Sequence, residues 1–231
     1  MQRAYVLRVR PFRDTQHLIQ LLTEHDGCFT AIIRTASGKR QHTSRAALRL
    51  FQPIYITWQG QGQLKRIQHI EIGTREIPLQ AERTIMAFYL NELCLRLLPQ
   101  QAPITGLLDT YHHTLMHLAS DADPQAYLRY FEAFLLQELG CLPSLIQDEK
   151  QEAIKHTTYY RIQPMQNWQV CHQDYGDSYI GEMLWQLHQH SLHPQHFQSA
   201  RKLLRQFLQP LLGPKPLSSR RLFQHYKRNQ T

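Results

Sequence analysis

Hydrophobic and polar residues alternate along the first third of the chain in short runs, a pattern typical of β-strands. Residues 3–10 show it most clearly, since Tyr5, Leu7 and Val9 share one face. Turn signals such as Asp26-Gly27 separate the runs. The pattern predicts five strands, at residues 3–10, 17–23, 28–35, 51–58 and 64–72. Five short strands favour a closed barrel, because closure leaves no sheet edge exposed. An OB-fold has this strand count, and an SH3-like barrel is the structural alternative.

From residue 78 onward, the hydrophobic period changes to that of helices. The helix at residues 124–139 has the clearest ends, because Asp123 and Pro124 suit the N-cap and N1 positions and Gly140 suits the residue after the C-cap. The other expected helices lie at residues 79–98, 104–119, 180–190 and 195–212.

The expected fold class is therefore α+β, with two domains. Residues 1–77 form a five-stranded OB-fold barrel, and residues 78–231 form a mainly α-helical domain. Within the second domain, residues 141–180 lack a clear period and are expected to be a small irregular insertion with short strands.

Charge is distributed in three blocks along the chain. The chain contains 26 Lys and Arg against 18 Asp and Glu, a net charge of +8. Residues 1–77 hold 12 basic and 5 acidic side chains, residues 78–180 hold 6 and 12, and residues 181–231 hold 8 and 1. Net basicity suggests an anionic partner such as nucleic acid. The division into blocks assigns the candidate anion-binding surfaces to the two ends of the sequence.

Compartment signals are few. No apolar run reaches the ~18 residues that a membrane span needs, and the N-terminus lacks the apolar core of a secretory signal. The four cysteines are scattered, with no Cys-x-x-Cys pair. We therefore expect a reduced, cytoplasmic protein without a membrane partner.

The strongest candidate for nucleic-acid contact is the segment at residues 36–50, which is too long for a hairpin turn. It contains no acidic residue and four cations, which are Lys39, Arg40, Arg45 and Arg49. Arg34 and Lys65 lie on the strands beside it. Cations bind phosphates because counterion release drives association, and nearby aromatic rings can stack on bases. A solvated surface is the simpler interpretation of any single residue, but the group favours DNA contact.

Catalytic and metal motifs are missing from the sequence. It contains no Gly-rich phosphate loop, no G-x-S-x-G and no H-E-x-x-H. His113 and His117 have helical spacing, but Thr114 stands where a zinc protease needs Glu. Cys141 and Cys171 lack the paired spacing of structural zinc. We expect no catalytic site, no metal and no cofactor.

Arg129 lies in the third expected helix, within an apolar stretch. An ion pair with Glu132, three residues on, is the simpler interpretation. The sharper hypothesis is that Arg129 rims an apolar pocket formed by Phe131, Leu135 and Leu139. Such a pocket would suit a peptide that ends in an aromatic residue and a carboxylate.

Three segments together resemble the RecO family of bacterial DNA repair and recombination mediators. They are QRAYVLRVRPFRDT at residues 2–15, LRYFEAFLLQELG at 128–140 and LLGPKPLSSRRLF at 211–223. YLNELCLRLLP at 89–99 is a weaker fourth. The resemblance implies an OB-fold, a helical domain and a smaller irregular region. It implies a non-enzymatic protein of the cytoplasm and nucleoid that binds single- and double-stranded DNA and anneals complementary strands. With RecR, and with RecF in some cases, it would load RecA onto DNA coated by the single-strand-binding protein SSB.

The resemblance also assigns roles to individual residues. The basic barrel loop of the family matches Arg34, Lys39, Arg40 and Arg45, and a strand cation matches Lys65. The family's K-P-L-x-S-R tail matches Lys215, Ser219 and Arg220, whose two cations are expected to contact DNA. The arginine that holds the acidic, Phe-ending SSB tail matches Arg129. Some members have four zinc-binding cysteines in the irregular region, whereas Cys141 and Cys171 alone lie near it here. The resemblance therefore implies that this region is held by packing, around Tyr159, Tyr160 and Trp168.

Two other functions remain open at this point. A metal-dependent nuclease guided by an OB-fold would need clustered Asp and Glu near the basic surface, but the acids lie mostly in the middle block. An RNA-binding OB-fold protein is the weaker alternative.

Overall fold

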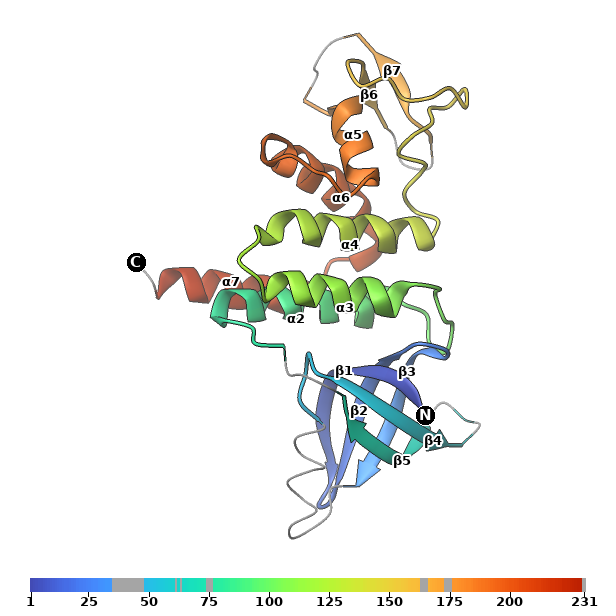
Figure 1. Cartoon of the computed structure of the whole chain (residues 1–231), viewed down its shortest axis with the longest axis vertical. Coiled ribbons are helices and arrows are strands. Elements are labelled where there is room, and N and C mark those ends of the chain that lie inside the picture. The colour runs from blue at the N-terminus through green and yellow to red at the C-terminus, as the bar shows by residue number, and fades with distance from the viewer. Residues whose placement is uncertain are drawn as a thin grey trace. The chain divides into compact units, whose positions relative to one another are not determined.

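The first five strands close into a barrel (Figure 1). The computed structural model describes residues 1–34, 48–60, 62, 64–73, 77–162, 166–172 and 176–229. The strands are β1 (Gln2–Arg13), β2 (Gln16–Thr23), β3 (Gly27–Arg34), β4 (Pro53–Gln59) and β5 (Leu64–Ile72). Their order around the barrel is β1-β2-β3-β5-β4, and β3 pairs with β5 in parallel. This closed order is that of an OB-fold and confirms the expected fold class.

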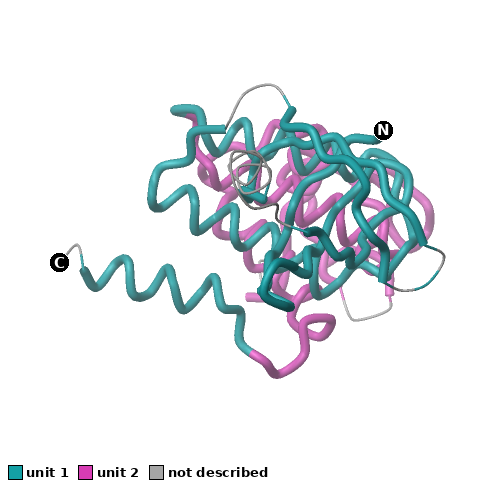
Figure 2. Tube along the Cα trace, turned by 90° about the horizontal axis from the view of Figure 1, so that it is seen from below, with its two compact units in different colours: residues 1–121, 216–231 teal, residues 122–215 magenta. Residues whose placement is uncertain are grey.

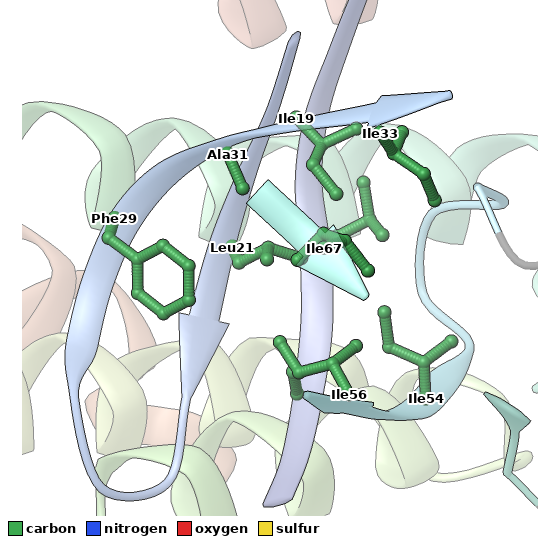
Figure 3. Packing of buried hydrophobic residues seen from close by; sticks show 10 residues of the cluster. Ile19, Leu21, Phe29, Ala31, Ile33, Ile54, Ile56 and Ile67 are labelled. Atoms are coloured by element: carbon green, nitrogen blue, oxygen red, sulfur yellow. The ribbon is translucent and has the colours of Figure 1, made fainter. Parts of the chain in front are cut away.

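Alternate residues of these strands fill the barrel interior (Figure 3). Ile19 and Leu21 on β2, and Ile54 and Ile56 on β4, are fully buried there. The two-residue spacing directs one face of each strand inward. Full burial of each isoleucine or leucine contributes about 1.5–3 kcal/mol relative to leaving it exposed.

Strand β1 is buried on both faces, which simple alternation does not reveal. Ala4 and Val6 belong to the barrel core, whereas Tyr5 and Leu7 face the other way and are also buried. A register shift between Val6 and Arg8 then returns Val9 to the barrel side, where it packs against the core. The face shared by Tyr5, Leu7 and Val9 in the sequence is therefore divided by a bulge.

Helices α2 (Ala81–Leu97), α3 (Leu107–Leu118) and α7 (Ser218–Arg228) belong to the same compact unit as the barrel. This unit comprises residues 1–121 and 216–231 (Figure 2). Buried polar groups fix α2 and α3 to β1. Asn91 donates to the Leu7 carbonyl at 2.9 Å, Tyr111 donates to Asn91 Oδ1 at 2.6 Å, and the Tyr5 hydroxyl lies 2.5 Å from His112 Nδ1.

The second unit, residues 122–215, contains α4 (Pro124–Glu138), α5 (Gly181–His188), a 3₁₀ turn η1 (Pro194–His196) and α6 (Phe197–Leu212). Helix α4 packs on α5 and α6. Its expected ends are confirmed, since Asp123 Oδ1 accepts from the Gln125 amide at 2.9 Å, Pro124 is the first helical residue, and Gly140 has a φ of 67°.

The irregular insertion contains a small sheet of three strands in the order β7-β6-β8. These are β6 (Tyr159–Arg161), β7 (Gln169–Cys171) and β8 (Ser178–Ile180). Trp168 is fully buried and donates from Nε1 to the Ser144 carbonyl at 2.7 Å. The buried Tyr160 hydroxyl accepts from the Lys155 amide at 2.9 Å. Buried aromatic rings with bonded polar atoms thus organise this region.

Candidate nucleic-acid interface and peptide site

Two arginines line a cavity of about 350 Å³ at the side of the barrel. Arg34 is exposed at the end of β3, and Arg66 is exposed on β5. The parallel pairing of β3 with β5 sets Arg66 opposite Ile32, so the two cations come to one region. Gln16 and Gln68 add side-chain amides, and isoleucines complete the lining. Guanidinium groups over an apolar floor suit a phosphate with a base beside it.

The other expected barrel cations are placed differently. Lys65 is half-buried and donates from Nζ to the Gly60 carbonyl at 3.1 Å, in the connection between β4 and β5. Lys39, Arg40 and Arg45 lie outside the described residues. Arg66 is a strand cation of the barrel, and the structure places it on the same cavity as Arg34. Its neighbourhood with Arg34 depends on the β3–β5 register, which no local pattern in the sequence reveals.

The C-terminal segment that matches the family's K-P-L-x-S-R tail contains helix α7. Lys215 is exposed at the end of the second unit, and Arg220 is exposed in the first turn of α7. Helix α7 packs against α2 (Figure 1). Ser219 is buried, and Phe223 and Tyr226 are half-buried on the same side of the helix.

The Glu92 carboxylate on α2 holds the start of α7. It accepts hydrogen bonds from the backbone amides of Ser218 at 2.9 Å and Ser219 at 3.0 Å, and from the Ser219 hydroxyl at 2.8 Å. Burial by itself raises the pKa of the Glu92 carboxyl. The hydrogen bonds from the two serines, together with Arg96 at 3.8 Å, outweigh burial and bring this pKa below its ordinary value. Ser219, matched by resemblance to the family tail, is therefore part of a carboxylate clamp.

Arg129 is buried and paired within its own helix. Its Nη2 lies 2.6 Å from Glu132 Oε1, and Glu132 is only 1% exposed, so the simpler interpretation of Arg129 is confirmed. Arg129 Nε has no hydrogen-bond partner in the described part of the chain. Phe131 and Leu135 have no exposed surface, and Leu139 is half-buried at the end of α4. Of the four expected peptide-site residues, Arg129 and Leu139 therefore reach the surface in part.

The described ranges contain neither a candidate metal site nor a helix that could span a membrane. Among those residues, no three His, Cys, Asp or Glu side chains gather into a group that could hold a metal ion. Cys141 and Cys171 are half-buried and are not joined in a disulfide bond. No described helix is long and apolar enough to cross a membrane.

A closed OB-fold barrel with exposed cations, joined to a mainly helical region, defines a class of OB-fold proteins suited to nucleic acids. Comparison with known proteins narrows this class. The family model described as "Recombination protein O N terminal" matches residues 1–74, and "Recombination protein O C terminal" matches residues 78–221. The chain therefore belongs to the RecO family.

Individual relatives agree with this assignment. The DNA repair protein RecO of Cellvibrio japonicus is 34% identical over 96% of both chains. That of Psychromonas ingrahamii is also 34% identical, over 95% of this chain and 96% of the relative. A Coxiella burnetii RecO is 32% identical over 96% of both. The nuclease alternative receives no support from these comparisons.

Proposed function

We propose that this protein is a non-enzymatic recombination mediator. It binds single- and double-stranded DNA, anneals complementary strands and, with RecR and in some cases RecF, helps to load RecA onto SSB-coated DNA. One observation supports this most directly. The barrel and residues 216–231, which hold four of the eight cations of the C-terminal basic block, belong to one compact unit. Annealing brings two polyanions together, and cations at both ends of one unit would screen their repulsion.

The first test concerns the barrel cations. Replacement of Arg34 and Arg66 by Ala should weaken single-stranded DNA binding equally for all sequences, because phosphate contacts contain no sequence information. The slope of log K against log salt should flatten by about 0.7 for each lost contact. Fluorescence anisotropy titrations over a range of salt concentrations measure both quantities. Lys39→Ala/Arg40→Ala tests the adjoining segment in the same way.

A matched control removes two cations from the net-acidic middle block. Lys150 and Arg161 are both exposed in the second unit, so Lys150→Ala/Arg161→Ala has the same effect on net charge. The control should leave affinity and slope close to those of the wild type. Equal losses of affinity in the barrel pair and the control pair would refute a specific barrel site.

Incubation of labelled DNA with the protein and Mg²⁺ adds a second criterion, because strand shortening would contradict a non-enzymatic role.

The peptide site is proposed around Arg129. Its buried guanidinium retains an Nε–H without an acceptor among the described residues, and an arriving C-terminal carboxylate would supply one. The bond to Glu132 must then be shared or exchanged. Because Phe131 and Leu135 are fully buried, an aromatic anchor would contact them only after local repacking of α4.

Testing Arg129 requires a variant that keeps the fold. Arg129→Ala alone leaves Glu132 buried without its partner, which costs about 3–5 kcal/mol for a buried pair. Arg129→Gln/Glu132→Gln removes both charges at similar volume. We expect this double variant to lose affinity for an acidic peptide ending in Phe, with a melting temperature and bare DNA affinity near those of the wild type. Unchanged peptide affinity in the double variant would refute the proposed site, and a fall in its melting temperature as large as that of Arg129→Ala would indicate a purely structural pair.

A further inference from the structure

One face of helix α7 carries positively charged side chains and no negatively charged ones. The sequence from Ser218 to Arg228 contains four Lys or Arg residues and no acid. At 100° per residue, these cations fall within an arc of about 120°. All four are exposed: Arg220, Arg221, Lys227 and Arg228. We call this set the α7 cationic face.

The opposite side of α7 explains why the cationic face points outward. Ser219 is buried, and Phe223 and Tyr226 follow at the spacing that keeps one side of a helix against its neighbour. Lys227 lies at the border of the two sides, since its Nζ is 4.9 Å from the centre of the Phe223 ring. The Glu92 carboxylate occupies the two leading amides of the helix. An anion at this end is therefore already supplied by the protein, and external anions must be met by the side chains of the cationic face.

The arrangement of the cations repeats along the helix. Arg220 and Arg221 form one pair, and Lys227 and Arg228 form a second pair seven residues on. Seven residues are two helical turns, or about 10 Å. A DNA strand presents a phosphate every 3.4 Å along a duplex axis, about three over that length. A periodic row of cations suits a periodic polyanion better than an acidic peptide, whose carboxylates are irregularly spaced.

We propose that the α7 cationic face is a second DNA-binding surface, distinct from the barrel cavity, which holds the incoming strand during annealing. The inference rests on the proposed annealing function and deepens it. The barrel binds one strand, α7 binds the other, and the Glu92 clamp keeps α7 on α2. Removal of the face should therefore slow annealing much more than it weakens binding of one strand.

The experiment compares two charge-matched triple variants. Arg221→Gln/Lys227→Gln/Arg228→Gln removes three cations from α7. The control, Arg201→Gln/Lys202→Gln/Arg205→Gln, removes three cations from exposed positions of α6. Each triple removes three positive charges, and glutamine is a good helix former. Anisotropy with one labelled oligonucleotide measures binding, and a fluorescence-quenching assay with two complementary strands measures annealing.

We expect the α7 triple to bind one strand with a Kd within about threefold of wild type and to anneal at least about tenfold more slowly. The α6 triple should retain both activities. Arg221→Lys/Arg228→Lys, which preserves charge, should anneal at close to the wild-type rate. Circular dichroism checks that each variant keeps its helices.

Four outcomes would overturn the proposal. The α7 triple could anneal at the wild-type rate, both triples could slow equally, or single-strand binding could fall as far as annealing. The fourth is loss of binding to an acidic Phe-ending peptide while annealing persists, which would make the face a peptide site. Failure of the proposed function looks different, because wild-type protein would then not anneal DNA at all.

Discussion

The Glu92 clamp is the contact on which the position of α7 depends, and Glu92→Gln probes it with little change in shape. Three hydrogen bonds converge on a carboxylate whose side chain is only 11% exposed. A hydrogen bond to a charged group contributes about 1.5–3 kcal/mol. Glutamine keeps one acceptor oxygen but turns an amide group toward the serine donors. It also removes the charge at the helix N-terminus, which is worth about 0.3–1 kcal/mol. We expect a loss of about 2–4 kcal/mol in the free energy of unfolding.

Urea unfolding followed by circular dichroism measures this loss, and limited trypsin digestion locates it. Trypsin should cleave first within α7, since a released helix exposes its arginine and lysine bonds. Glu82→Gln, in the first turn of the same helix α2, is the matched control and should cost less than about 1 kcal/mol. A cost below about 1 kcal/mol for Glu92→Gln, with unchanged cleavage of α7, would refute the clamp.

The pH dependence of this clamp has a definite sign. Folding lowers the pKa of Glu92, so its stabilisation is fully present above the ordinary glutamate pKa and is lost as pH falls through the lower, folded value. The stability gap between wild type and Glu92→Gln should therefore narrow as the pH falls from neutrality to below about 4. A gap that stays constant over this range would contradict the ionised carboxylate as its source.

Two further predictions concern the packing of the first unit. Gly27 has a φ of 64°, and a Cβ there would lie 2.4 Å from the Ala102 carbonyl oxygen. Gly27→Ala should therefore lower the free energy of unfolding, measured in urea, by at least about 2 kcal/mol. A Cβ at Gly62 would meet no atom of the described residues within 4 Å, so Gly62→Ala should change stability by less than about 0.5 kcal/mol. Equal effects of the two substitutions would contradict the close approach at Gly27. Tyr111→Phe leaves the buried Asn91 Oδ1 without its donor and should cost about 1–3 kcal/mol by the same assay, whereas a neutral result would contradict the buried network.

Features set by local spacing could be predicted from the sequence. The Asp123-Pro124 start of α4, the Gly140 end and the Arg129–Glu132 pair each depend on residues within a few positions of one another. The barrel followed from alternation of short strands, although the bulge in β1 and burial on both its faces did not. Burial of that second face depends on α2 and α3, which lie far along the chain.

Features set by distant contacts could not be predicted in the same way. Glu92 and Ser219 are 127 positions apart, so no spacing rule connects them. Helix α7 has a short apolar side, which is buried only by its contact with α2. In the sequence alone, the cations of this segment stand out and the helix does not. The cavity between Arg34 and Arg66 likewise depends on a parallel strand register.

We propose that this RecO family member brings DNA strands together without altering them. Annealing of complementary oligonucleotides, bare and coated with SSB, tests it most directly when strand length is checked on a denaturing gel in the presence of Mg²⁺. We predict that the wild-type protein accelerates annealing of both kinds of strand, that Arg129→Gln/Glu132→Gln loses the acceleration on coated strands alone, and that no strand is shortened. Absence of acceleration at low salt, or shortening of the DNA, would contradict the account.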